Sequence, residues 1–121
     1  MTMQLAEFVA MNQTTRDTVR HYIDLGLLTP QKQGKNYAFT AADTADFAEI
    51  VELKEMGFSL AAIQSIKERH DTQCGTPTQW QANRELVEDE LATIEKELQT
   101  LMVRKTKLTA LRKQLDGRLQ Q

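Results

Sequence analysis

Residues 18–28 read TVRHYIDLGLL, and this stretch says more about the fold than any other part of the 121-residue chain. Val19, Tyr22 and Ile23 fall at i, i+3 and i+4, which predicts one buried face of a short helix. Gly26 follows the last residue of that pattern, where a left-handed conformation commonly ends a helix. A short helix with a buried back and a basic front is suited to a DNA groove, although a solvated surface helix would show the same pattern.

A second short amphipathic helix is predicted just before this one. Its buried face comprises Leu5, Phe8 and Val9. The polar residues 12–14 make the turn between the two helices, and Thr14 is expected to cap the second helix in a capping box with Asp17. Two short helices joined by a tight polar turn form the outline of a helix-turn-helix.

A small β-hairpin is predicted after the second helix. Gly34 offers the turn, and Tyr37 and Phe39 alternate as the residues of a strand do. Lys32, Lys35 and Asn36 cluster at its tip. A hairpin with a basic tip is a wing, an element that usually touches the phosphate backbone of DNA.

Two further helices are expected to complete the core. The first spans residues 40–57, is capped by Thr40 with Asp43, and stops at Gly57. Its buried stripe comprises Phe47, Ile50 and Val51. Ser59 is expected to cap the shorter helix that follows, which is buried through Leu60, Ile63 and Ile66. Plain core packing explains each of these residues.

The C-terminal segment has a heptad pattern that predicts a coiled coil. From Trp80 onward apolar residues recur every seven positions, and the companion positions four residues on are half apolar. The dimerisation residues expected in this seam are Trp80, Val87, Leu91, Ile94, Leu98, Leu101, Leu108 and Leu115. Thr78 and Gln81 are expected to cap the helix. A helix of about 40 residues is about 60 Å long and cannot bury such a stripe on a small domain, so it needs a partner.

The charges of this segment favour an antiparallel partner. Six acids and one base lie between Glu85 and Glu97, and six bases and one acid lie between Arg104 and Arg118. A parallel pair would place like charges side by side, whereas an antiparallel pair crossing near Leu101 lays each acidic half against a basic half. Each exposed ion pair contributes only ~0.2–1 kcal/mol, but their sum can decide the orientation. The alternative is a solvated charge run without any orienting role.

Three ordered motifs resemble the MerR (mercury-resistance) family of bacterial winged-helix regulators. They are LAEF at 5–8, TVRHY at 18–22 followed by LGLL at 25–28, and LKEMGFSLAAI at 53–63. The resemblance spans roughly residues 3–70, and the long C-terminal helix fits it too. The sequence departs from the family pattern at His21, where an aromatic is usual, at Gln13, where a turn glycine is common, and in the wing, where an arginine usually accompanies the aromatics.

The sequence thus predicts a mostly α-helical chain in two parts. Residues 1–75 form a winged helix-turn-helix DNA-binding domain, and residues 76–121 form a coiled-coil dimerisation helix. The resemblance implies a short-form regulator without a C-terminal effector-binding domain. It implies a homodimer that binds a pseudo-palindromic promoter operator, distorts the DNA, and meets RNA polymerase there. The residues expected to contact double-stranded DNA are Thr14, Thr15, Arg16, Thr18, Arg20, His21, Tyr22, Lys32, Lys35, Asn36 and Tyr37.

The charge balance keeps an alternative open. The net charge is −2, which is low for a DNA-binding protein. Residues 1–40 hold four Lys or Arg against three Asp or Glu, and residues 41–75 hold three against seven. The alternative is therefore an interaction or adaptor protein whose long helix binds a partner and whose DNA-binding face is weak or lost.

The single cysteine, Cys74, lies in a polar loop before the long helix. One thiol cannot build a closed metal site, so no metal or other cofactor is expected, and a redox thiol is the other candidate role. The chain has no Gly-rich phosphate loop and no nucleophile with an evident base, so no enzyme is expected. It also has neither a signal peptide nor an apolar run near membrane length, which places it in the cytoplasm.

Overall fold

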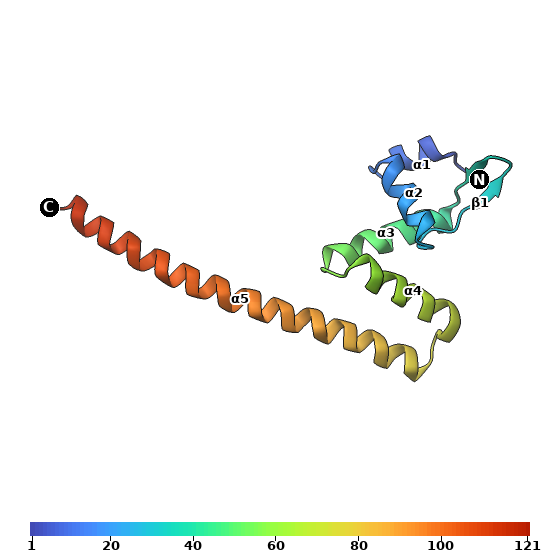
Figure 1. The fold of residues 1–121 in the computed structure, drawn as a ribbon. Helices are drawn as coiled ribbons and strands as arrows, with labels where there is room; N and C mark the ends of the chain where they lie inside the picture. Colours follow the sequence, from blue (N-terminus) through green and yellow to red (C-terminus); the bar gives the residue numbers. More distant parts are fainter. The chain divides into compact units, whose positions relative to one another are not determined.

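The chain forms two compact units in the computed structural model, which describes residues 1–121 (Figure 1). The first unit, Met1–Gln81, contains α1 (Leu5–Met11), α2 (Arg16–Asp24), β1 (Gln31–Gln33), β2 (Asn36–Ala38), α3 (Ala41–Glu55), α4 (Leu60–Gln73) and the start of α5. The second unit, Ala82–Gln121, contains the rest of α5 (Pro77–Leu119). The predicted fold class, a mostly helical chain with one small hairpin and one long C-terminal helix, is confirmed.

The core of the first unit is built around phenylalanine rings from three elements. Phe8 of α1 stacks on Phe39, with ring centroids 4.3 Å apart, and meets the edge of Phe47 of α3 at 5.9 Å. Such aromatic pairs contribute about 0.5–1.5 kcal/mol beyond the area they bury. Met3 and Phe39 exchange backbone hydrogen bonds of 2.7 and 2.8 Å, so the N-terminus is fixed to the end of the hairpin.

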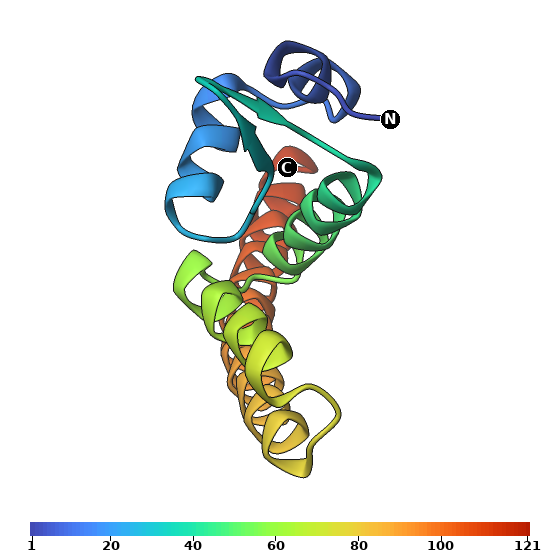
Figure 2. The same ribbon diagram turned by 90° about the vertical axis from the view of Figure 1, so that its right-hand side faces the viewer.

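The hairpin is antiparallel and closely follows the prediction. Gln31 pairs with Ala38, Lys32 with Tyr37 and Gln33 with Asn36. Gly34 begins the two-residue turn with a φ of 64°, a left-handed value that glycine adopts at little cost. Figure 1 shows the hairpin projecting from the helices of the first unit, and Figure 2 shows the same strands from the side on which they project.

The first three helices end in the same way. In each, the second residue past the cap donates its backbone N–H to the carbonyl five residues earlier, as in a Schellman motif: Thr14 to Val9, Leu27 to Tyr22, and Phe58 to Leu53. The residue before each donor is left-handed, with φ values of 53° at Gln13, 77° at Gly26 and 100° at Gly57. Gln13 is the only non-glycine residue of the chain with a positive φ.

Two of the predicted helix caps are confirmed and two are shifted. The Thr40–Asp43 capping box is present, and Ser59 caps α4 by accepting from the Ala62 N–H. Helix α2 is capped by Thr15 rather than Thr14, because the Thr14 N–H completes the end of α1. Helix α5 begins at Pro77, a residue suited to the first helical position, so Thr76 rather than Thr78 accepts from the Gln79 N–H.

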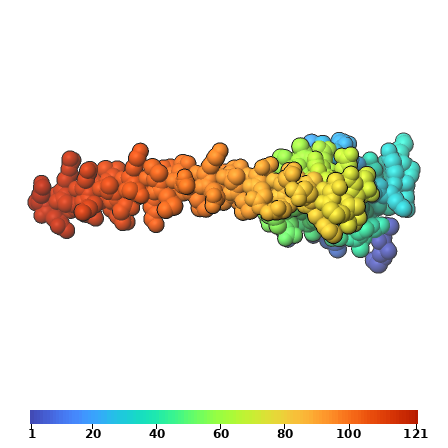
Figure 3. Space-filling view, turned by 90° about the horizontal axis from the view of Figure 1, so that it is seen from below, coloured from blue at the N-terminus to red at the C-terminus, as the bar shows by residue number.

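The predicted buried stripes are mostly correct. Phe47 and Ile50 of α3 are buried, but Val51 is 37% exposed, which corrects its place in the stripe. In α4 only Ile63 is buried, whereas Leu60 and Ile66 are half-buried. In the second unit every residue of α5 from Leu91 onward is exposed, and the 43 residues of the helix, shown in space-filling form in Figure 3, give a length of about 65 Å.

Candidate nucleic-acid interface

Helix α2 presents a basic face to solvent and an apolar face to the core. Val19 is completely buried and Ile23 is half-buried, while Arg16, Arg20 and His21 are exposed. Arg16 and Arg20 are four residues apart and therefore lie on the same side of the helix. A helix of nine residues with this division can expose its N-terminal turns to a DNA groove.

Tyr22 is a core residue, which corrects its inclusion among the DNA-facing side chains. Its side chain is only 6% exposed, and its ring lies 6.0 Å from the ring of Phe47. The apolar periodicity that places Val19 and Tyr22 on one face excludes Tyr22 from the opposite one. The two expectations for Tyr22 therefore conflict, and the packing decides between them.

The start of α2 is fixed by two threonines. The Thr15 hydroxyl oxygen accepts from the Thr18 N–H at 3.1 Å, and the Thr15 hydroxyl donates to Thr18 Oγ1 at 2.9 Å. Thr15 is exposed, and Thr14 and Thr18 are half-buried. This helix end carries partial positive charge, which favours a nearby phosphate.

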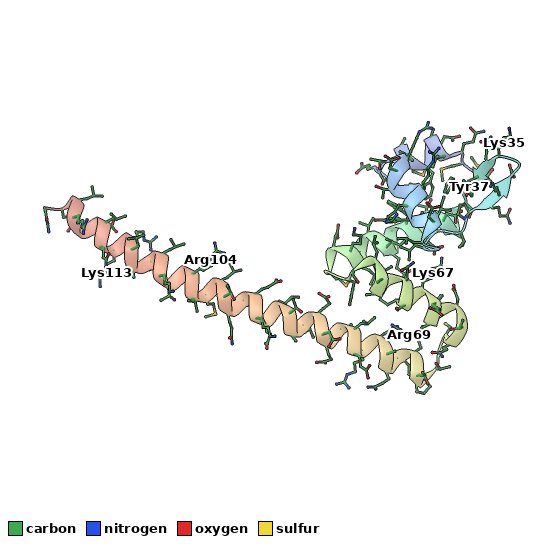
Figure 4. All side chains as sticks on the ribbon, in the orientation of Figure 1. Lys35, Tyr37, Lys67, Arg69, Arg104 and Lys113 are labelled. Carbon is green, nitrogen blue, oxygen red and sulfur yellow. The ribbon has the colours of Figure 1, made fainter.

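The wing brings together the remaining predicted contacts. Lys32, Lys35 and Asn36 are exposed, and Tyr37 is half-buried. The Lys32 ammonium lies 5.7 Å from the centre of the Tyr37 ring, within the range of a cation–π contact. Figure 4 shows Lys35 and Tyr37 on the hairpin. The Lys32 ammonium thus lies near the Tyr37 ring, and Lys32 itself is exposed.

The predicted seam of α5 is exposed along its whole length. The eight apolar residues Trp80, Val87, Leu91, Ile94, Leu98, Leu101, Leu108 and Leu115 are each between 41% and 63% exposed. Three further apolar side chains, Met102, Val103 and Leu111, are 50–67% exposed and were not predicted as part of any surface. Met102 and Leu111 flank the seam in the heptad, so the same pattern could have identified them.

Cys74 lies at the end of α4, where it is exposed. Its Sγ is 3.7 Å from Nδ1 of His70, one helical turn earlier. No group of three or more His, Cys, Asp or Glu side chains is arranged to hold a metal ion. None of the helices combines the length and apolar character needed to cross a membrane.

Comparison with known proteins identifies the family of this chain. Residues 3–69 match the model of the MerR helix-turn-helix family of regulatory proteins. The chain belongs to the MerR family. It is a DNA-binding transcription regulator of that family, with a winged helix-turn-helix in its N-terminal part. A comparison with curated protein sequences gave no match.

Solved structures of MerR-family regulators share the fold. HiNmlR, described as a MerR-family regulator lacking the sensor domain and bound to promoter DNA, is 24% identical, with a TM-score of 0.59 over 86% of this chain and 87% of its own. A MerR-family transcriptional regulator from Bacillus cereus is 27% identical, with a TM-score of 0.53 over 81% and 75%. The N-terminal part of the Bacillus subtilis multidrug transporter activator, MtaN, is 20% identical, with a TM-score of 0.57 over 82% and 93%.

Proposed function

We propose that this MerR-family protein is a homodimer that binds a pseudo-palindromic promoter operator and regulates transcription by distorting the promoter DNA. The observation that carries the proposal is one compact unit that exposes both a basic helix and a basic hairpin, followed by a helix with an uncovered apolar seam. The basic helix and the basic hairpin of one copy bind one half of the operator. The apolar seam allows two copies to dimerise.

The proposed DNA contacts divide between the two elements. Arg16, Arg20 and His21 of α2 reach the groove and its phosphates, with Thr14, Thr15 and Thr18 at the start of the helix. The wing residues Lys32, Lys35, Asn36 and Tyr37 hold the flanking backbone. Residues 1–40 contain only four Lys or Arg, so one copy has few phosphate contacts. Doubling them in a dimer is what gives the complex useful affinity.

The proposed dimer is an antiparallel pair of α5 helices. Eight large apolar side chains that are about half exposed are costly in water, and a second copy with the same seam is the partner that covers them. The acidic half of each helix, 85–97, then lies against the basic half of the other, 104–118. In a parallel pair each acidic half would lie against the acidic half of the other copy, and each basic half against the other basic half, so the like charges would repel.

One register aligns every core layer of that pair. In this register Leu98 faces Leu101 of the second copy, Leu91 faces Leu108, and Trp80 faces Leu119. Lys105 and Arg112 enter the seam opposite Ile94 and Val87, where their long stems cover apolar surface and their charges reach the partner's acidic half. The centre of the pair then lies between residues 99 and 100, beside the crossing expected at Leu101.

The promoter-distorting mechanism is proposed from the family membership and from the promoter-bound state of HiNmlR, and the meeting with RNA polymerase is proposed from the family membership. The low basicity supports a second candidate, an adaptor that uses α5 to bind another protein. The two candidates differ in whether the protein enriches a DNA sequence.

Selection of bound genomic fragments followed by sequencing tests the proposal. A two-fold symmetric motif near promoters is expected, whereas the absence of any enriched motif would favour the adaptor. Leu101→Asp is the matched dimer-defective control. It buries two like charges close together in the seam, at a cost of about several kcal/mol, so the dimer should dissociate and the motif should be lost. Sedimentation of parent and variant at equal concentration measures the first effect, and a variant that stays dimeric would contradict the proposed pairing.

A further inference from the structure

The turn that joins α2 to the wing, residues 25–28, is held by two side chains of α4. Gln64 Nε2 donates to the carbonyl oxygen of Leu25 at 2.8 Å, and Lys67 Nζ donates to the carbonyl oxygen of Leu27 at 3.0 Å. Gln64 and Lys67 are three residues apart, so they lie on the same face of α4. Figure 4 shows Lys67 on this helix. Both hydrogen bonds are partly buried, where they are stronger than in water.

These bonds complete the turn in a way that its own backbone does not. The Schellman motif at the end of α2 uses the carbonyls of Tyr22 and Ile23, and it leaves those of Leu25 and Leu27 to other donors. The side chains of Leu27 and Leu28 point into the core and are each 1% exposed. The turn is therefore fixed on one side by apolar packing and on the other by α4.

We propose that Gln64 and Lys67 are positioning residues for DNA recognition, which set the spacing and angle between α2 and the wing. The inference rests on the proposed function, because it concerns the two elements that are to contact DNA. Phosphate contacts fix the register of a protein on the duplex, and base contacts read the sequence from that register. If the turn moves, the spacing and angle between the wing and α2 are no longer fixed. The protein then binds its operator more weakly, while weak, sequence-independent binding to DNA persists.

The surroundings of the two bonds allow this role to be separated from folding. An open groove of about 620 Å³ borders them, with Gly26 and Ser65 among its lining residues. Water can therefore replace a deleted donor without a collapse of the core. Substitution by methionine keeps about the length of the side chain and removes the donor, together with the amide oxygen of Gln64 or the positive charge of Lys67.

The test compares Gln64→Met and Lys67→Met with the parent protein on its selected operator and on unrelated DNA. Each variant loses one hydrogen bond in each of the two copies of the dimer, so it should bind the operator at least about tenfold more weakly, and it should bind unrelated DNA within about twofold of the parent. Sedimentation and thermal unfolding should show a folded dimer. Lys67→Arg keeps a cationic donor and should restore operator binding. Ser65→Ala, on the same groove but bonded to its own helix at Ala61, is the matched control and should bind as the parent does.

Two results would overturn the positioning role while leaving the proposed function intact. One is unchanged operator affinity in Gln64→Met. The other is an equal loss on operator and unrelated DNA in Lys67→Met, which would make Lys67 a direct phosphate contact. A parent that selects no operator would overturn both proposals together.

Discussion

At the scale of single residues, the proposed DNA-binding face has few positive charges. Arg16, Arg20, Lys32 and Lys35 are the only Lys or Arg residues in the first 40 positions, and Asp17 and Asp24 lie on the same helix as the two arginines. In a strongly basic domain the loss of one cation has a small effect on DNA affinity, because many others remain. Here each cation is a large share of the total, so single substitutions should have effects that are easily measured.

Arg20→Ala should weaken operator binding and reduce its dependence on salt. Arg20 is exposed, so the fold should be unaffected. If each Arg20 neutralises one phosphate, the slope of log K against log salt should become less steep by about 0.9 per contact, and hence by about 1.8 for the dimer. Titrations at several salt concentrations measure this slope. If neither slope nor affinity changes, Arg20 does not belong to the interface.

Cys74→Ser should leave dimerisation and operator affinity unchanged under reducing conditions. Cys74 is exposed at the end of α4, and the side chain near its thiol is His70, at 3.7 Å. Removal of one exposed sulfur therefore disturbs no packing. Sedimentation and DNA titration of the variant, with and without peroxide, check this. A peroxide response of the parent that the serine variant lacks would instead assign a redox role to Cys74.

At the scale of the elements, the end of α1 has a strained backbone that a glycine would relieve. Three helices share one type of ending, and two of them place glycine at its left-handed position, whereas α1 places Gln13 there. A left-handed backbone brings the Cβ of an L-residue close to the following carbonyl, at about 1–2 kcal/mol. This turn separates α1 from α2, so any strain in it lies next to the proposed DNA-binding helix.

Gln13→Gly should therefore stabilise the protein. The relief of backbone strain is partly offset by the greater freedom of glycine in the unfolded chain, which leaves a net gain of up to about 1 kcal/mol. Gly26→Gln is the reciprocal control at the end of α2. A Cβ there meets no atom within 4 Å, so its expected loss is conformational alone. Denaturant unfolding of both variants measures the two changes. A destabilised Gln13→Gly would show that the glutamine side chain makes a compensating contribution.

The elements themselves could be predicted from the sequence because their signals are local. Apolar periodicity places Val19 inside and Arg20 outside, and the strand alternation identifies the hairpin. The predicted cap of α2, Thr14, is one residue early, because its N–H completes the end of α1, and the predicted cap of α5, Thr78, is two residues late, because the helix already begins at Pro77. The bonds of Gln64 and Lys67 join residues 39 and 40 positions apart, so no local pattern could indicate them.

At the scale of the whole molecule, the charges of α5 determine which pairing a second copy can adopt. In the proposed antiparallel register Glu97 of each copy lies beside Arg104 of the other, so one ion pair occurs twice near the centre. In a parallel register Glu97 and Arg104 would instead lie beside uncharged residues, Met102 and Thr109. Glu97 and Arg104 therefore distinguish the two orientations, although each exposed pair contributes only ~0.2–1 kcal/mol.

Exchange of these charges between two variants tests orientation and register together. Glu97→Arg alone places two arginines together at both positions, and Arg104→Glu alone does the same with two glutamates, so each variant should form a weaker homodimer. When the two variants are mixed, both positions again join an arginine to a glutamate, and the heterodimer should predominate. Native mass spectrometry of the mixture measures the amounts of the two homodimers and the heterodimer.

The double variant Glu97→Arg with Arg104→Glu is the control and should dimerise as the parent does. A statistical mixture of the three dimers would contradict the register, because only the antiparallel pairing brings these two side chains together.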